Sequence, residues 1–347
     1  MADIYGSAAL IDMVRLGLPD EFFFTQFLFS QQRFSLVEDI LIDEMVEKKG
    51  IAPFVMPHVD GKAIVGTGYS TRTYRPAYIK LRDAIRASNL TKRGFGEPIN
   101  GVPNALARLN AGRLSALEQH VNAIRRRVEW MCAQFCIAGG YTVSGERYTT
   151  QVLNFGRDAS LTVVLSGAAL WSAASTATPT ANFRAWGTLL FTKGYAPADT
   201  VIMSPEAWDA FAETADIKAK YSLFKDLGGS LPAILPQVAA KIQYKGSYGG
   251  YNIIVFNDTY EDETGAVQRY LPAGMVLMVA GGEAGLGGRR IYGPIQHLQA
   301  IKSGMQQVEV FPYEWESDDG EAHMIGTQSA PLVAARKVNC VLAAQVI

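Results

Sequence analysis

The chain has little charge, little cysteine and no long apolar run, and each shortage excludes a class of protein. Charged residues make up 19% of the 347 residues, whereas soluble domains usually carry about 25%. The net charge of -1 argues against an electrostatic nucleic-acid binder, which would be clearly basic. No stretch reaches the ~18 consecutive apolar residues of a membrane-spanning helix, and the first residues lack the basic region of a signal peptide. We therefore expect no membrane association.

Groups that bind metals or carry out catalysis are also sparse. The cysteines, Cys132, Cys136 and Cys340, lack metal-ligand spacing and are interpreted as small apolar residues in a reducing compartment. The histidines are isolated, and the G-x-S-x-G and H-E-x-x-H motifs are absent. The glycine-rich run 281–288 lacks the lysine and the serine or threonine of a phosphate-binding loop. We predict no catalytic residue, no cofactor and no metal.

One long amphipathic helix dominates the pattern of apolar residues. From Leu114 to Ala138 they recur at spacings of three and four, which places them on one stripe of a helix. Gly139 and Gly140 end it, and a helix over 113–138 would be about 39 Å long. The flanking positions carry no regular charge code, so the pattern favours a helix laid along a sheet over a coiled coil. The residues expected in its buried core are Leu117, Val121, Ile124, Val128, Met131 and Phe135.

Residues 1–50 are expected to form an extended or partly helical arm. An aromatic run from Phe22 to Phe34 cannot stay in water, so it packs either in the core or on a neighbouring chain, and both remain open. Residues 38–45 alternate as a strand does. Low charge without a membrane segment suggests that large interfaces between copies cover much of the surface.

Residues 51–82 are interpreted as a long two-stranded ribbon. They are rich in strand-forming residues and turn at a glycine-containing centre. Such a ribbon is marginally stable alone in water, so it needs a surface to lie on. Its charges are Asp60 against the five cations Lys62, Arg72, Arg75, Lys80 and Arg82. Because the rest of the chain is not basic, we expect an acidic protein surface as its partner.

The chain after the helix is expected to hold a hairpin at 141–146 and strands at 151–155 and 161–165. A mixed α/β insert follows near 175–303, and two strands then flank the acidic turn 317–321. Serine as N-cap and proline at the first helical position mark the start of one helix in the insert. The elements expected there are helix 181–194, strand 200–203, the helix begun by Ser204 and Pro205, and strands 239–244, 251–256 and 275–279.

Short motifs lie along the chain in a characteristic order. The ribbon carries Pro53-Phe-Val-Met-Pro-His-Val-Asp-Gly61, then Ser70-Thr71 and Pro76-Ala-Tyr-Ile-Lys80. Further along are Tyr141-Thr142 with Gly145-Glu146, Tyr244-Lys-Gly with Tyr248-Gly249, Tyr270-Leu-Pro272, Tyr292-Gly293 with Ile295-Gln296, and Gln328-Ser-Ala-Pro-Leu332. In number, order and spacing this series resembles the lambda-like major capsid proteins of tailed phages, the protein E family. The resemblance covers nearly the whole chain.

The resemblance implies an α+β chain with the Hong Kong 97-type capsid fold. Its implied parts are an N-terminal arm at 1–50, an extended β-hairpin loop at 51–88, a peripheral domain at 89–174 with spine helix 113–138, an axial domain at 175–303, and a return to the peripheral domain at 304–347. The implied function is that of a major capsid protein. It would self-assemble into an icosahedral shell around a double-stranded DNA genome, through a scaffolded procapsid that expands.

The resemblance also implies partners and a location. The partners are other copies in pentamers and hexamers, a portal, a decoration protein at threefold sites, and DNA enclosed without sequence-specific binding. Because the ribbon begins near residue 51, we expect no long N-terminal scaffolding segment and hence a separate scaffolding protein. Some relatives cross-link covalently through a lysine and an asparagine, but Lys62 has no assignable partner and we expect no cross-link. The protein would belong to the virion and be assembled in the bacterial cytoplasm.

Contacts between subunits are expected at charged segments. We predict that Arg72 and Arg75, with Lys62 on the same ribbon, lie on an acidic turn of a neighbour, and that the polar side of the long helix, Asn122, Arg125 and Arg126, faces the inner wall. The acids of that turn are Glu316, Asp318 and Asp319. Two alternatives stay open: a capsid-derived bacterial nanocompartment that holds a cargo enzyme, and an enzyme that binds a nucleotide through the glycine loop 281–290.

Overall fold

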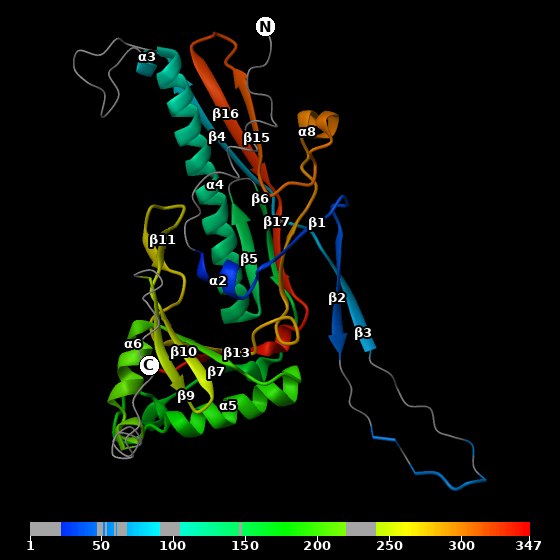
Figure 1. Ribbon diagram of the computed structural model, residues 1–347, viewed down its shortest axis with the longest axis vertical. Coiled ribbons are helices and arrows are strands. Elements are labelled where there is room, and N and C mark those ends of the chain that lie inside the picture. The colour runs from blue at the N-terminus through cyan, green and yellow to red at the C-terminus, as the bar shows by residue number, and fades with distance from the viewer. Residues whose placement is uncertain are drawn as a thin grey trace.

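The protein is described by a computed structural model over residues 22–46, 51–52, 54–58, 60, 68–90, 105–145, 148–219 and 241–347. A single long helix, α4 (Ala105–Ala138), runs through most of its length (Figure 1). Its 34 residues would span about 51 Å at the usual rise. The predicted helix is confirmed, although it begins at Ala105 rather than at residue 113.

The apolar stripe of α4 is buried within the chain itself. Leu117, Val121, Ile124, Val128, Met131 and Phe135 are each at most 4% exposed. Leu114, which belongs to the same periodic pattern, is 41% exposed, so burial begins one turn later than the pattern suggests. The helix contacts strands of several sheets of its own chain. It is therefore laid along sheets, as predicted, and the stripe is already covered without a coiled-coil partner.

An antiparallel three-stranded sheet lies along the first half of α4. Its strand order is β15-β16-β4, with β15 at Phe311–Glu316, β16 at Ala322–Ser329 and β4 at Ile79–Arg86. The two strands expected around the acidic turn 317–321 are confirmed as β15 and β16. Strand β4 is a correction, because residues 79–86 had been placed in the extended loop 51–88 but pair with β16 from Ile79↔Ser329 to Arg86↔Ala322.

The ribbon consists of β2 (Ile40–Val46) and β3 (Gly68–Tyr74). They pair antiparallel from Ile40↔Tyr74 to Val46↔Gly68. Its first strand therefore lies in residues assigned to the arm 1–50, and the boundary expected at residue 51 is wrong. Alternation at 38–45 had indicated a strand, but only pairing shows which strand is its partner.

The segment that precedes the ribbon packs on the chain's own core. It forms the short helix α2 (Phe23–Phe27) and β1 (Gln31–Phe34). Strand β1 pairs parallel with β14 (Gly288–Tyr292), which pairs antiparallel with β17 (Pro331–Ala335). Strand β14 lies within the insert expected at 175–303 but pairs with strands from outside it. Of the two open alternatives for the aromatic run, burial in the core is confirmed for Phe22, Phe23, Phe24 and Phe29.

A mixed six-stranded sheet forms the other end of the molecule, with α5 (Pro179–Gly194) and α6 (Pro205–Glu213) beside it (Figure 1). Its order is β7 (Thr162–Val164), β18 (Val341–Gln345), β13 (Met275–Val279), β8 (Thr200–Met203), β10 (Tyr251–Phe256) and β9 (Ile242–Tyr248). The strands predicted at 200–203, 251–256 and 275–279 are confirmed. The insert boundaries are wrong, because β7 precedes residue 175 and β18 comes from the C-terminal segment assigned to the peripheral return.

Shorter elements complete the described chain. A hairpin does follow α4, but its strands are β5 and β6, and the hairpin expected within 141–146 is wrong because Ser144 and Gly145 belong to β5. Ser204 caps α6 by accepting a hydrogen bond from the amide of Ala207. The strand expected at 239–244 begins at Ile242, and residues 239–240 lie outside the described residues. The remaining elements are β5 (Gly140–Gly145), β6 (Tyr148–Asn154), β11 (Thr259–Glu261), β12 (Val267–Arg269), α3 (Ala87–Leu90), α8 (Leu298–Ser303) and three 3-10 turns at Ala159–Leu161, Gly167–Ala169 and Val338–Cys340.

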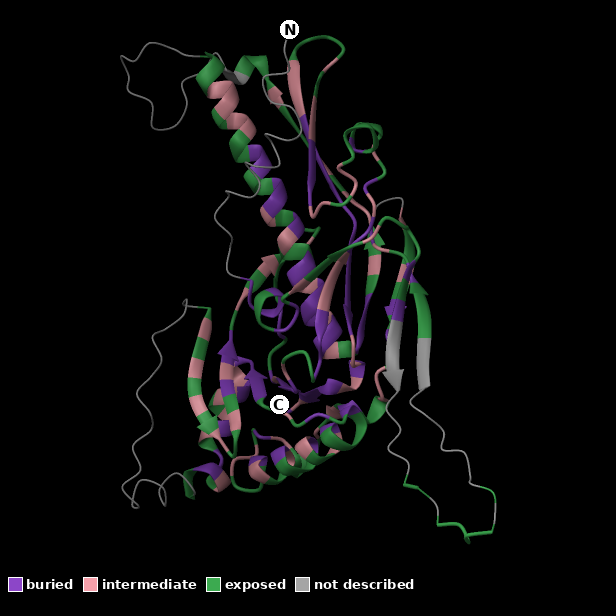
Figure 2. Cartoon of the chain, turned by 45° about the vertical axis from the view of Figure 1, so that its right-hand side comes forward, coloured by how far each residue is buried: buried purple, intermediate pink, exposed green. Residues whose placement is uncertain are grey.

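Burial is concentrated where the C-terminal half of α4 meets the sheets (Figure 2). The described part of the ribbon beyond its root, and the far end of the three-stranded sheet, are largely exposed. The molecule is therefore an elongated body with one compact core and projecting parts that have little core of their own.

Candidate assembly surfaces

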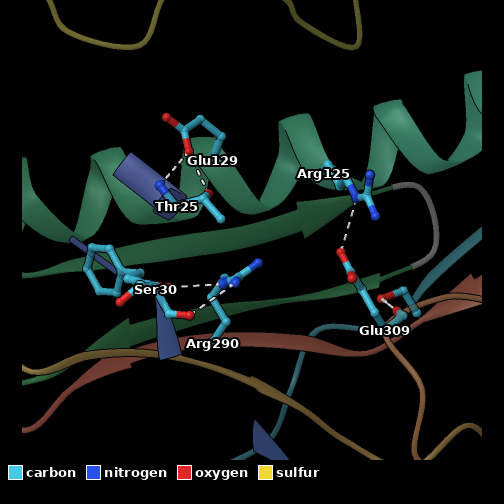
Figure 3. Close-up of polar contacts among 8 residues, drawn as sticks. Thr25, Ser30, Arg125, Glu129, Arg290 and Glu309 are labelled. Carbon is cyan, nitrogen blue, oxygen red and sulfur yellow. Dashed lines mark hydrogen bonds and ion pairs between the residues drawn. The ribbon is translucent and has the colours of Figure 1, made fainter. Parts of the chain in front are cut away.

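A buried carboxylate fastens the N-terminal segment to α4. Glu129 is 1% exposed, and its two carboxylate oxygens accept hydrogen bonds from the amides of Phe24 (2.7 Å) and Thr25 (2.8 Å) and from the Thr25 hydroxyl (2.5 Å) (Figure 3). These amides belong to the first turn of α2, where backbone donors have no partner within the helix. Burial raises the pKa of Glu129, while the three hydrogen bonds act in the opposite direction. The carboxylate thus replaces an N-cap that Phe22 cannot supply.

A guanidinium holds the other end of the same segment. Arg290 on β14 donates from Nε to the carbonyl of Phe29 (2.9 Å) and from Nη2 to that of Ser30 (3.4 Å) (Figure 3). Between the two charged anchors, Phe29 packs on Phe135 of α4. Glu129 and Arg290 had not been singled out in the sequence. The available signal in the sequence was an acid, Glu129, directly beside Val128 of the buried stripe.

The root of the ribbon is packed and neutralised within the chain. Arg75 donates to Asp39 over 2.6 Å. The ring of Tyr74 packs against Phe155, and its hydroxyl donates to the carbonyl of Asn154. The same carbonyl also accepts from Nη1 of Arg72 over 3.4 Å. The two arginines expected to contact a neighbour therefore have partners in their own subunit. Lys62, the third cation expected there, lies outside the described residues.

Beyond the root, the ribbon carries exposed apolar side chains. Ile51 and Met56 are largely exposed, and Phe54 is fully exposed. Near the root, Leu36, Val37 and Leu41 are also exposed. Isolated exposed apolar residues are ordinary, but a group on a projecting ribbon is typical of an interaction site.

The acidic turn between β15 and β16 is exposed and ordered by its own hydrogen bonds. Asp319 accepts from the hydroxyl of Ser317 (2.5 Å) and from the amide of Glu321 (3.2 Å), which lowers its pKa. Glu316, Asp318 and Asp319 all face solvent. The turn is therefore a compact group of carboxylates at one end of the molecule.

The polar side of α4 is tied to other segments by ion pairs. Arg113 pairs with Glu314, Arg125 with Glu309 (3.3 Å) and Arg127 with Glu263 (2.5 Å) (Figure 3 shows the second). Arg125 had been expected at the inner wall with Asn122 and Arg126. It is only partly exposed and pairs with Glu309 in the segment that leads into β15. Arg126 is exposed.

The glycine loop does not form a phosphate cradle. The amide of Gly281 donates to Asp199 (3.0 Å), and those of Leu286 and Gly287 donate to carbonyls of the same loop. A Cβ at Gly285 would lie 2.2 Å from the carbonyl oxygen of Ala280, so the glycine serves close backbone packing. Since these amides are occupied and a carboxylate faces the loop, the geometry favours a structural turn over the nucleotide-binding alternative.

The described residues contain no group of three histidine, cysteine or acidic side chains placed to hold a metal ion. Searched over the same residues, no helix is both long and apolar enough to span a bilayer. What the described surface does offer is an elongated body with a projecting apolar ribbon and charged edges. Those features define a structural protein that associates through extended surfaces.

The particular family follows from comparison with known proteins. The chain belongs to the phage major capsid protein E family, whose profile matches residues 13–346. It is 26% identical to the P21 prophage-derived major head protein of Escherichia coli O6:H1 strain CFT073. This match extends over 299 residues, which are 85% of each chain. It is 24% identical over 299 residues to the major capsid protein of Escherichia phage lambda, again covering 85% of each.

Solved structures show the same fold. A prophage capsid protein structure from E. coli CFT073 superposes with a TM-score of 0.72 at 19% identity and covers 98% of this chain and 99% of that one. The SrpI encapsulin of Synechococcus elongatus PCC 7942 superposes with a TM-score of 0.50 at 9% identity, covering 97% and 95%. The fold is thus the Hong Kong 97-like capsid fold that the sequence resemblance implied. Because encapsulins share it, the family match rather than the fold distinguishes a phage capsid protein from a nanocompartment shell.

Proposed function

We propose that this chain is the major capsid protein of a tailed phage or prophage and that its copies close into an icosahedral shell. The family match over residues 13–346 is the observation that carries the proposal. The projecting ribbon supports it, since a fully exposed Phe54 needs a surface that its own subunit does not supply. The structural nature of the family is also consistent with the scarcity of catalytic groups.

Electron microscopy of the purified full chain tests this proposal. Closed shells or ring-shaped capsomers are expected, and a stable monomer that binds a small ligand would overturn it. DNA-free shells filled with a cargo enzyme would favour the nanocompartment alternative. A rise in the thermal unfolding midpoint on adding nucleotides would revive the nucleotide-binding alternative.

The domain roles within the shell are part of the proposal. The ribbon β2–β3 would be the extended loop, α4 the spine helix, and the sheet β15-β16-β4 the peripheral sheet beside it. The six-stranded sheet with α5 and α6 would form the axial domain, whose tips meet at the fivefold and sixfold positions. These assignments follow the strand pairing described above rather than the boundaries expected from the sequence.

The finer steps of assembly are proposed on the same basis. Copies would form pentamers and hexamers of a scaffolded procapsid, which expands when DNA is packaged, in the bacterial cytoplasm. A separate scaffolding protein, a portal and a decoration protein at threefold sites would be the partners. Near-zero net charge suits a wall that encloses DNA without gripping it. A tight, salt-sensitive affinity of the isolated protein for DNA would contradict that last point.

Charged contacts between subunits remain a proposal. In it, Arg72 and Arg75, with Lys62, lie against Glu316, Asp318 and Asp319 of a neighbour. Exposed ion pairs are each worth less than about 1 kcal/mol, but every subunit repeats them. In this version, reversing the charges of Arg72 and Arg75 would impair assembly and reversing Asp318 and Asp319 in addition would restore it, whereas the contact inferred below predicts no such restoration. The pair Arg75–Asp39 weighs against this version, because docking would have to share or break it.

A further inference from the structure

The sheet β15-β16-β4 has one face on α4 and a second face that α4 does not cover. On β4, Ile79 and Leu81 pack with Val121 and Ile124 of α4, and Ile85 is the side chain nearest to Gly112. Alternate residues of a strand point to opposite faces. The other set, Lys80, Arg82, Ala84 and Arg86, therefore lies on the open face, and all four are exposed.

Pairing across the sheet shows what else lies on that face, because directly opposed residues share it. Lys80, Arg82 and Arg86 lie opposite Gln328, Gly326 and Ala322 of β16. Across β16, the residues Gln328, Gly326 and Met324 lie opposite Phe311, Tyr313 and Trp315 of β15. The face away from α4 thus carries a cation column on β4, an uncharged column on β16 and an aromatic column on β15. One end of this face is covered, because Phe311 and Gln328 are buried and Phe311 packs with Ile295 and with Ala300 of α8. The open part holds the exposed cations and Trp315.

The aromatic column is closely packed. The rings of Tyr313 and Trp315 stack 5.3 Å apart at 11°, and Tyr313 lies over Gly326, where a Cβ would come within 2.3 Å of the ring. Trp315 remains 38% exposed at the open end. Tryptophan, tyrosine and arginine are the residues most enriched at energetically important interface positions. The face has the composition of an interface.

The cation column has no carboxylate partner within the described residues. No ion pair there involves Lys80, Arg82 or Arg86, and Lys80 lies over the ring of Tyr78 at 5.1 Å. The acids of these strands point elsewhere, as Glu314 does when it accepts from Arg113 of α4. In contrast, Arg75 on the ribbon is neutralised by Asp39. The structure thus divides the basic segment of the sequence into a paired part on the ribbon and an unpaired part on β4.

The chain's own acidic turn cannot neutralise the whole column. Arg86 lies opposite Ala322, next to the turn, but Lys80 is six residues further along β4, a distance of about 20 Å in a strand. The four exposed acids of the turn, Glu316, Asp318, Asp319 and Glu321, have no ion pair in the described residues either. Because only Arg86 lies beside the turn of its own chain, the far end of the cation column can meet such a turn only on a second copy.

We infer that the acidic turn 316–321 of one copy docks on the open face of a second copy, against the cation column Lys80, Arg82 and Arg86, with Trp315 beside it. The inference rests on the proposed self-assembly and identifies the cations of the contact as those of β4 rather than Arg72 and Arg75. Opposite charges would bring the copies together in a fixed register, and Trp315 would supply apolar contact.

Charge reversal with restoration tests the contact. One variant carries Lys80→Glu, Arg82→Glu and Arg86→Glu, a second carries Asp318→Lys, Asp319→Lys and Glu321→Lys, and a third combines all six. Shells are counted by electron microscopy and sedimentation, and the thermal unfolding midpoint of unassembled subunits checks folding. We expect each reversal to lower shell yield by about tenfold or more through like-charge contacts, and the combination to restore most of it.

The matched control reverses Arg72 and Arg75 together with the acidic turn, and it should not restore assembly. The inference would be overturned if that control restored assembly. It would also be overturned if the variant with all six substitutions failed to restore assembly while all variants fold. A neutral variant, Lys80→Gln, Arg82→Gln and Arg86→Gln, avoids new repulsion and should still reduce shell yield. If the neutral variant assembles like the unaltered chain, the inference is wrong and the cations only protect the edge strand β4 from wrong pairing. The unaltered chain separates the two possible failures. If it forms shells, the proposed function stands and only the inferred contact is in question; if it forms none, the proposed function itself fails.

Discussion

At the scale of single residues, Glu129 shows how a charged group is retained in the core. Burial disfavours its ionised form, but the carboxylate accepts hydrogen bonds from two amides in the first turn of α2 and from the Thr25 hydroxyl. Losing such an acceptor leaves buried donors unpaired, which costs more than the hydrogen bonds contribute on balance. The residue is therefore a positioning group for the N-terminal segment rather than a chemical one.

Replacing Glu129 with alanine is expected to destabilise the subunit by about 1–3 kcal/mol, because the amides of Phe24 and Thr25 lose their acceptor. Chemical denaturation of unassembled subunits measures the loss. Glu118→Ala is the matched control, since Glu118 is exposed on the same helix and should change stability little. Equal effects of the two substitutions would contradict the anchoring role.

The raised pKa of Glu129 also predicts a direction of pH dependence. An acid whose pKa is higher in the folded than in the unfolded state stabilises most below its unfolded value, here 4.5, and this contribution is lost as pH rises through the folded pKa. Glu129→Gln removes the titration. The difference in unfolding free energy, wild type minus variant, should therefore decrease from pH 4 towards neutrality, as measured by denaturation at several pH values. An increase over this range would show that the hydrogen bonds outweigh desolvation.

At the scale of elements, α4 was predictable because its signal is local. Apolar residues at helical spacing and the terminal glycines need no knowledge of the remaining chain. Strand β4 was not placed correctly, since alternation identifies a strand but not its partner, which here is β16 near the other end of the sequence. The ribbon boundary failed for the same reason, as β2 is recognisable as the first ribbon strand only through its pairing with β3.

Val128→Asp is expected to prevent folding, because Val128 is 2% exposed in the main core and the substitution buries a charge without a partner. Soluble expression and circular dichroism would show the loss. Arg126→Ala on the same helix should leave the subunit folded, since Arg126 is exposed and bonds only to the backbone of Asn122 in the described structure. A folded Val128→Asp subunit would mean that the stripe is not buried.

At the scale of the whole molecule, the described residues divide into a compact core and parts that project from it. The six-stranded sheet contains strands from before, within and after the expected insert, so segments far apart in the sequence pair in its core. The ribbon and the outer end of the three-stranded sheet project away from the core (Figure 1). This division explains why low overall charge coexists with exposed apolar and charged groups.

Phe54→Asp should leave subunit stability unchanged, because Phe54 is fully exposed, but should reduce shell yield strongly if the ribbon tip is buried between subunits. Thermal unfolding and electron microscopy measure the two effects separately. Val152→Asp is a control with a similarly exposed apolar residue on β6, away from the ribbon tip. Normal assembly of the Phe54 variant would remove the tip from the contact.

The sequence by itself determined the long helix, most strands, the helix cap at Ser204 and the family, because these depend on local periodicity, turn chemistry and ordered motifs. Only the tertiary structure decided that four phenylalanines of the aromatic run lie in the core, that Glu129 and Arg290 hold this segment there, and that Arg75 is neutralised while the cations of β4 are not. The physical reason is that burial, strand pairing and ion pairing depend on residues far apart in the chain. A periodic pattern shows which face of an element is apolar, but the partner of that face is set by the whole fold.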